Sequence, residues 1–295
     1  MALRTHITER QRRLGAELRK LREAAGLSVN AASSRIGMGA AHLSHIEAAR
    51  TAVSADRLVA LLYAYDVRSE PYTTHLAGMA ESDGKGWWTE FRTRLPQHSL
   101  DLAELEARAP KIQSYETLLV PGLLQTEAYM RALFYSSRPG ASPSEIEALV
   151  DFRRARQQIL SDDSTTALHA IVHEAALRIT VGSPEVMRGQ LSHLVRAAQR
   201  PGTTIQILPF ESGARAWFGT PILILDSDAP GLETVMLEHP AAPLLLGDAE
   251  SIARYKSAFN SLKRNALSPV TADGPPGSHE HRDSWGLIHH VLYTH

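Results

Sequence analysis

The residues that could do specific chemistry lie close together between positions 40 and 45. His42, Ser44 and His45 carry groups that can hydrogen-bond to the edge of a base. Ala40 and Ala41 can offer only methyl contacts, for example to thymine. On a helix these positions would face outward, so the segment is a candidate for reading bases in the major groove of double-stranded DNA. No Arg, Gln or Asn stands on this face, so we expect few bidentate hydrogen bonds from a side chain to a base.

Four short helices are predicted in residues 1–66 from the spacing of apolar side chains. Gly26 ends the first helix, Ser28 caps the second, Gly37 stops the second, and Ser54 starts the fourth. The second and third helices are expected over Ser28 to Ile36 and Ala40 to Ala48. The expected core positions are Leu14, Leu18, Leu21, Ala25, Leu43, Ile46, Leu58, Leu61, Leu62 and Tyr65. Two short helices around a tight glycine turn are typical of a helix-turn-helix, and the alternative is a helical bundle without a role in DNA binding.

Residues 27–50 resemble the Cro/C1-type (XRE-type) helix-turn-helix family. The segment Leu43-Ser44-His45-Ile46-Glu47-Ala48-Ala49-Arg50 matches the end of that family's recognition helix, except that Ala49 stands where the family has Gly. The resemblance implies that Arg22 pairs with Glu47 and ties the first helix to the recognition helix, a structural role without base contact.

The same resemblance implies a Gln at the start of the second helix that holds a DNA phosphate. This sequence has Val29 there, which puts that contact in doubt; Ser28, Asn30 and the helix N-terminus could substitute.

The charge of the chain is distributed unevenly. The net charge is -1, but residues 1–66 hold 10 Lys+Arg against 6 Asp+Glu, so this part is basic and the remainder is acidic. A basic module ahead of an acidic one favours nucleic acid as the partner of the first part. Arg50, Arg10, Arg12 and Arg13 are candidate phosphate partners, and the alternative for these arginines is a solvated basic face.

A larger domain with mixed elements is predicted over 87–269. The expected helices are Leu100 to Ala109, Glu127 to Phe134, Ser144 to Leu160, Glu185 to Gln199 and Ala249 to Leu262. The expected strands are Ile112 to Tyr115, Ala167 to Val172, Thr204 to Leu208, Ile222 to Leu225 and Thr234 to Glu238. The fold class is therefore an all-α helix-turn-helix domain of four or five helices followed by an α+β or irregular α/β domain.

Several segments of this second part resemble the actinobacterial helix-turn-helix regulators with a DUF5753 domain, which are antitoxin-like. The matching segments are Gly86–Trp88, Leu105–Ala109, Val120–Tyr129, Arg153–Gln157, Glu174–Leu177, Gly182–Met187, Gln190–Leu191, Ile207–Phe210 and Ala266–Pro269. The resemblance covers about Arg10 to Pro269. It implies a transcription factor, sometimes encoded beside a small DUF397-type protein, and it transfers no ligand and no catalytic set.

The sequence argues against an enzyme. His173-Glu174 has half of a zinc motif, but Leu177 stands where the second His would be, and there is no Walker loop, dinucleotide fingerprint or Gly-x-Ser-x-Gly. We therefore predict no catalytic residues, no cofactor and no metal. The chain has no cysteine, no apolar run long enough for a membrane span and no secretory signal in Met1 to Arg13, so we expect a cytoplasmic protein without a membrane partner.

The domain boundaries follow from composition. We expect a helix-turn-helix domain over 1–69, a linker over 70–86, the second domain over 87–269 and a flexible tail over 270–295. Trp87-Trp88 is expected to anchor a core edge rather than to stack on bases. The tail holds His279, His281, His289, His290 and His295, which could ligate a transition metal, and Trp285–Ile288, which could dock as a short helix.

These observations predict a sequence-specific DNA-binding transcriptional regulator that acts as a homodimer, because one short helix reads too few bases for a unique site. The second domain would dimerise, sense a signal or hold a partner protein. The alternative is an antitoxin-like interaction module that sequesters a small DUF397-type partner, with DNA binding secondary.

Overall fold

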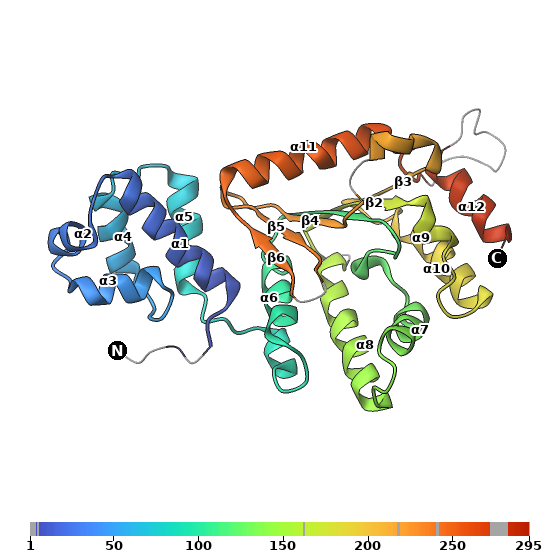
Figure 1. The fold of residues 1–295 in the computed structure, drawn as a ribbon, viewed down its shortest axis with the longest axis horizontal. Helices are drawn as coiled ribbons and strands as arrows, with labels where there is room; N and C mark the ends of the chain where they lie inside the picture. Colours follow the sequence, from blue (N-terminus) through green and yellow to red (C-terminus); the bar gives the residue numbers. More distant parts are fainter. Residues whose placement is uncertain are drawn as a thin grey trace. The chain divides into compact units, whose positions relative to one another are not determined.

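The computed structural model describes residues 4, 6–161, 163–216, 219–239, 242–271 and 283–294. The chain divides into two compact units (Figure 1). The N-terminal unit contains the described residues up to Arg92, together with Pro96–Leu105 and Asp228–Leu232. The sheet unit contains Thr93–Leu95, Glu106–Ser227 and the described residues from Glu233 onward. The predicted class, a helical helix-turn-helix region followed by a mixed α/β domain, is confirmed.

The N-terminal unit is all helical. Its helices are α1 (Glu9–Ala24), α2 (Val29–Arg35), α3 (Ala40–Glu47), α4 (Ala55–Ala64), α5 (Glu70–Glu81), the 3-10 helix η1 (Trp87–Phe91) and α6 (Gln97–Glu106). Thr8 and Gln11 form a capping box at the start of α1, and Ser28 caps α2 as predicted. These caps satisfy amide groups that the first turn of each helix leaves without a partner.

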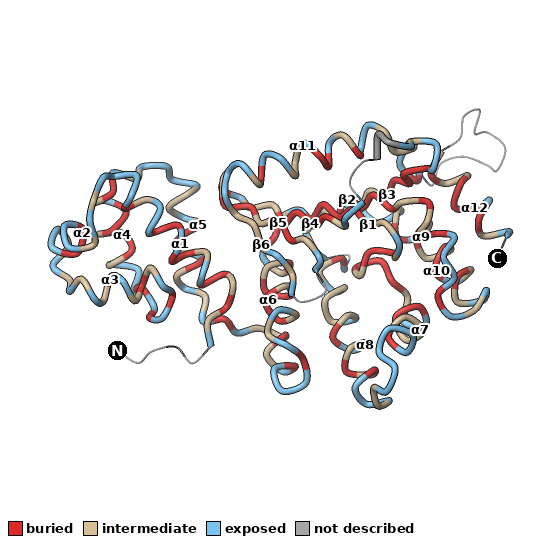
Figure 2. Tube along the Cα trace, in the orientation of Figure 1, coloured by how far each residue is buried: buried red, intermediate tan, exposed pale blue. Residues whose placement is uncertain are grey.

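One apolar core holds helices α1 to α5 together (Figure 2). Of the expected core positions, Leu14, Leu18, Leu43, Ile46, Leu58, Leu61, Leu62 and Tyr65 are buried. Leu21 is partly buried and packs against them, but Ala25 is exposed because α1 ends at Ala24 and the chain turns away. Complete burial of leucines such as Leu18 and Leu61 contributes about 2 kcal/mol each to folding.

Two further segments belong to the same core. The stretch expected as a linker contains α5, whose Leu76 and Met79 are buried in it. Residues 228–232, which lie between two strands of the sheet unit in the sequence, contribute Ala229 and Leu232. Within this unit the Arg13 guanidinium donates to the Gly231 carbonyl oxygen at 2.9 Å. A short part of the second half of the chain is thus built into the helix-turn-helix unit.

The expected role of the tryptophan pair is confirmed. Trp88 is buried, its ring meets that of Trp87 edge to face at 5.8 Å, and its Nε1 donates to the Gly84 carbonyl oxygen. A residue buried in this way anchors a core and has no free ring face to offer a base.

The sheet unit is built on six strands in the order β3-β2-β1-β4-β5-β6. They are β1 (Lys111–Glu116), β2 (Ala167–His173), β3 (Thr203–Leu208), β4 (Ile222–Leu225), β5 (Thr234–Leu237) and β6 (Leu244–Leu246). The first three run parallel and β4 to β6 are antiparallel to their neighbours. The five predicted strands are confirmed, whereas β6, which has only three residues, was not predicted.

Helices cover the two faces of the sheet (Figure 1). Helix α11 (Ala249–Asn265) packs on one face through Phe259 and Leu262, against Tyr115, Ile171 and Ile224 of the strands. The other face carries α7 (Glu127–Ser137), α8 (Pro143–Gln157), α9 (Glu174–Arg178) and α10 (Pro184–Ala197). Asp248 caps α11 by accepting from the Ser251 amide, and His173 caps α9, so these two residues have structural roles.

The predicted flexible tail is wrong for its last part. Ser284–Thr294 forms helix α12, and Leu287, Ile288 and Val291 are buried. These apolar side chains lie on one helix face, so docking removes them from water and offsets the entropy of ordering the segment. The Ser284 hydroxyl also accepts a hydrogen bond from the Ile207 amide at 2.8 Å. His279, His281 and His295 lie outside the described residues, and His289 stacks on Trp285.

Candidate nucleic-acid interface

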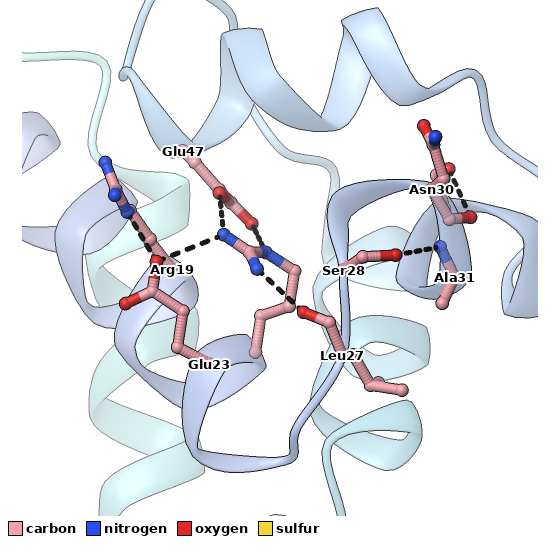
Figure 3. Close-up of polar contacts among 9 residues, drawn as sticks. Arg19, Glu23, Leu27, Ser28, Asn30, Ala31 and Glu47 are labelled. Carbon is pink, nitrogen blue, oxygen red and sulfur yellow. Dashed lines mark hydrogen bonds and ion pairs between the residues drawn. The ribbon is translucent and has the colours of Figure 1, made fainter.

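Helix α3 is held against α1 by a buried ion pair (Figure 3). Arg22 donates from Nε and Nη2 to the two carboxylate oxygens of Glu47 at 2.7 and 3.0 Å, and from Nη1 to the Leu27 carbonyl oxygen at 2.8 Å. Only 8% of the Arg22 side chain and 6% of the Glu47 side chain are exposed. The hydrogen bond to Glu47 raises the pKa of the Arg22 guanidinium. The pairing implied by the family resemblance is confirmed, and it fixes the orientation of α3.

A close backbone approach also positions α3. Gly15 of α1 lies against the end of α3, so a methyl group at Gly15 would stand 2.5 Å from the Glu47 carbonyl oxygen and 3.0 Å from that of Ile46. Both obstacles are backbone atoms that cannot move without shifting the helix. The sequence does contain one signal of this contact, which is a glycine inside the apolar stripe of a helix. Glycine lowers helix propensity and brings no local benefit there, so its presence indicates a close contact.

We expect Gly15→Ala to destabilise the N-terminal unit by about 2 kcal/mol, because the added methyl forces α1 and α3 apart. The matched control is Gly189→Ala in α10, where an added methyl meets nothing within 4 Å and helix propensity should raise stability. Urea denaturation followed by circular dichroism measures both. Equal stabilisation by the two substitutions would contradict the close approach.

Ala49 ends the recognition segment in a conformation that favours glycine. Its φ is +58° and it is buried, while the Arg50 amide donates back to the His45 carbonyl oxygen at 2.8 Å. A left-handed backbone costs a residue with a side chain about 1 kcal/mol. This geometry explains why the family pattern has Gly where this chain has Ala49.

Apart from His42, the predicted base-contact residues lie on one surface of α3. Ala41 and Ser44 are exposed, Ala40 and His45 are half-exposed, and Arg50 is exposed just beyond the helix end. Because Leu43 and Ile46 on the opposite side are buried in the core, the outward side is the one that a major groove could receive.

The expectation for His42 needs correction. Its Nε2 atom is buried and has no hydrogen-bond partner among the described residues. Burial lowers the pKa of His42, and the nearby positive charge of Arg57 lowers it further. The Nε2 atom therefore faces the protein and cannot meet a base edge in this conformation.

The phosphate-contact candidates divide into available and unavailable groups. Ser28 and Asn30 are exposed at the start of α2 (Figure 3), although the Ser28 hydroxyl already accepts from the Ala31 amide at 3.1 Å. Val29 packs against the core, so it does not supply the phosphate contact that the resemblance implies for a Gln at this position.

Two of the other arginine candidates are unavailable. Arg10 is buried, and Arg13 is held by Glu17 and the Gly231 carbonyl oxygen, so neither can reach a phosphate. Arg12 is exposed and pairs with Glu9.

One arginine that the sequence did not single out lies beside the end of α3. The Arg4 amide donates to the Arg50 carbonyl oxygen at 2.9 Å, and its Nη1 donates to the Ala49 carbonyl oxygen at 3.1 Å. Burial lowers the pKa of Arg4. The N-terminal segment therefore braces the turn that follows the recognition helix.

The described residues hold few features of other functional classes. Across them, no three or more His, Asp and Glu side chains gather into a group suited to a metal ion. The helices of the described part also lack the combination of length and apolar character needed to cross a membrane. Glu174, half of the partial zinc motif, pairs with Arg178 and accepts from the Phe210 amide, so it is occupied structurally.

Fold and surface together define a helix-turn-helix protein, the class of DNA-binding regulators. In a comparison with family models, the helix-turn-helix domain model matches residues 13–76, and the model described as a domain of unknown function (DUF5753) matches residues 100–272. The second match covers more than half of the chain, which therefore belongs to the DUF5753 family. No curated protein and no solved structure gives a match.

Proposed function

We propose that this protein is a sequence-specific transcriptional regulator that binds its operator through the exposed face of α3. The observation that carries the proposal is the pairing of Arg22 with Glu47, which holds α3 with Ser44 and His45 outward. A recognition helix must be held rigidly if its side chains are to select one base sequence. The proposed place of action is the cytoplasm, where the operator would be accessible.

The proposed active form is a homodimer of the XRE type. Helix α3 has eight residues, and few of its side chains face outward, so one copy reads only part of an operator. Two copies would read two half-sites about 34 Å apart on one face of the duplex.

The sheet unit is proposed to act on DNA binding through residues 228–232. Strands β4 and β5 continue directly into this segment, and its Ala229 and Leu232 belong to the core that supports α1. At the ends of the two strands, Lys256 of α11 pairs with both Asp226 and Glu233, at 3.0 and 2.6 Å. A movement of these strands would therefore be transmitted through the chain into the helix-turn-helix core.

The signal that moves the sheet unit is proposed to come from binding and not from catalysis. The family resemblance adds an antitoxin-like role, with a small DUF397-type protein as a possible partner. A stoichiometric complex with such a protein, isolated from the native cell, would support that partner.

Replacing His45 and Arg50 tests the surface. His45→Ala should shift or relax sequence preference, because His45 is the half-exposed hydrogen-bonding side chain on the face. Arg50→Ala should weaken binding to all sequences alike and reduce the slope of log affinity against log salt by about 1, as expected for a phosphate contact.

The control is Arg188→Ala, which makes the same charge change in α10 of the sheet unit and should leave both properties unchanged. If neither His45→Ala nor Arg50→Ala alters DNA binding, the interface lies elsewhere.

A further inference from the structure

Arg4 is a cation of the N-terminal unit that forms no ion pair with the described residues. Its amide and its Nη1 atom are the groups that hold it, and they donate to the carbonyl oxygens of Arg50 and Ala49. Its Nε and Nη2 atoms have no hydrogen-bond partner in the described part of the chain, and neither is buried. One side of the guanidinium is thus fixed on the turn after α3, and the other side is open to a ligand.

Arg50 is a second unpaired cation, and it belongs to that turn itself. Its side chain is exposed and makes no hydrogen bond or ion pair with the described residues. Ala49 and Thr51, on either side of it, are buried. The Arg50 and Thr51 amides both donate to the His45 carbonyl oxygen, at 2.8 and 3.4 Å. The turn is therefore held firmly on the end of α3, and it carries the Arg50 side chain outward.

Several other arginines of this unit are neutralised by carboxylates within it. Arg12, Arg13, Arg19, Arg22 and Arg68 form ion pairs with Glu9, Glu17, Glu23, Glu47 and Asp66 in that order. Arg4 and Arg50 differ from these five, although a backbone hydrogen bond of 2.9 Å joins the two residues. Cations that lie close together repel each other unless an anion lies between them. The turn after α3 is therefore a place where a bound anion would be favourable.

The surroundings of Arg4 favour a phosphate as that anion. Burial lowers the pKa of its guanidinium, because the charged form loses part of its contact with water. The carbonyl oxygens that it binds carry only partial negative charges. A phosphate group carries a full charge and can accept two parallel hydrogen bonds from the Nε and Nη2 side of one guanidinium.

The two arginines adjoin the surface of α3 that is proposed to read bases. The turn follows directly after this helix, and His45, whose carbonyl oxygen anchors the turn, is half-exposed on the outward face. A helix that lies in the major groove has DNA phosphates on both sides, and cations beside it fix its register on the duplex.

We propose that Arg4 and Arg50 together bind a backbone phosphate of the operator, with Nη1 of Arg4 kept on the Ala49 carbonyl oxygen and its Nε and Nη2 atoms donating to the phosphate. The inference rests on the proposed regulatory function, and it adds the segment before α1 to the DNA-binding surface. Arg4 then has two roles, since it braces the turn and also contributes its own charge to DNA binding.

The test is the salt dependence of DNA binding by the full chain. The probes are the duplex enriched by selection and a random-sequence duplex of the same length. Arg4→Ala should weaken binding to both at least about fivefold, and it should reduce the slope of log affinity against log salt by about 1. Arg4→Lys should keep the slope, because the positive charge remains. Thermal denaturation checks that each variant is folded.

Arg35 provides the matched control in the same unit. It is exposed, forms no ion pair with the described residues, and donates to the Ala64 carbonyl oxygen at 3.3 Å. Like Arg4, it is therefore a cation held on a carbonyl oxygen at the end of a helix. Ala64 ends α4, whereas the turn after α3 leads into the start of that helix, ten residues or about 15 Å away. Arg35→Ala should leave affinity within about twofold and the slope unchanged.

The double substitution Arg4→Ala with Arg50→Ala separates direct contact from bracing. If both side chains bind phosphate, the slope should fall by about 2. A double variant that matches Arg50→Ala alone would mean that Arg4 only holds Arg50 in place, and it would overturn the inference. An unchanged slope in Arg4→Ala would also overturn it.

The same experiment tells this inference apart from the proposed function. If Arg4→Ala has no effect whereas His45→Ala and Arg50→Ala alter binding, the phosphate contact of Arg4 is wrong and DNA binding by α3 stands. Failure of the unaltered chain to bind either duplex would overturn both.

Discussion

Replacing Arg22 by Met is expected to lower the free energy of unfolding of the N-terminal unit by about 3 kcal/mol. The substitution leaves the Glu47 carboxylate, 6% exposed, without its cation in a region that water scarcely reaches. It also removes the hydrogen bond to the Leu27 carbonyl oxygen. The double substitution Arg22→Met with Glu47→Leu should recover much of the loss, because two apolar side chains leave no buried charge. Urea denaturation followed by circular dichroism measures all three proteins.

The control for this prediction is Arg19→Met on the same helix. Arg19 forms an i,i+4 ion pair with Glu23 at 2.8 Å, but both side chains are more than half exposed. Exposed pairs of this kind contribute less than about 1 kcal/mol. A loss at Arg22 no larger than that at Arg19 would show that the buried pair does not hold α3 in place.

Ser44→Glu is expected to reduce DNA affinity at least about hundredfold. It places a negative charge on the outward face of α3, where the phosphates of both strands surround a helix in the major groove. Ser44 is exposed, so stability should be almost unchanged. Binding to a set of labelled duplexes at constant salt gives the affinity, and thermal denaturation checks the fold.

Ser144→Glu provides the matched change for this test. It adds the same charge at an exposed position in the first turn of α8, in the sheet unit, and should leave DNA affinity intact. Equal losses from Ser44→Glu and Ser144→Glu would indicate general charge repulsion rather than a contact surface on α3.

The helix-turn-helix could be predicted because its signals are local. The apolar spacing from Leu14 to Leu21 and the glycine turn at Gly37 are visible within a few residues of sequence. The role of Gly15 could not be predicted, because it depends on a helix that contacts it only in the folded chain. The burial of the His42 Nε2 atom could not be predicted for a similar reason, because it depends on packing in the folded chain.

The sheet unit shows where sequence patterns stop being informative. The five predicted strands are rich in Ile, Val and Leu, but three-residue β6 is too short to give a periodic signal. The Gly- and Pro-rich segment before α12 predicts a flexible tail, yet the apolar face of the helix docks.

Selection of duplexes from a random DNA pool by the full-length protein, at about 0.15 M salt, tests the central claim most directly. We expect enrichment of a two-fold symmetric motif with half-sites about one helical turn apart. We also expect Ser44→Glu to abolish the enrichment and His45→Ala to change the preferred bases. If no motif is enriched, or if the same motif is recovered with Ser44→Glu, then α3 does not read DNA as proposed.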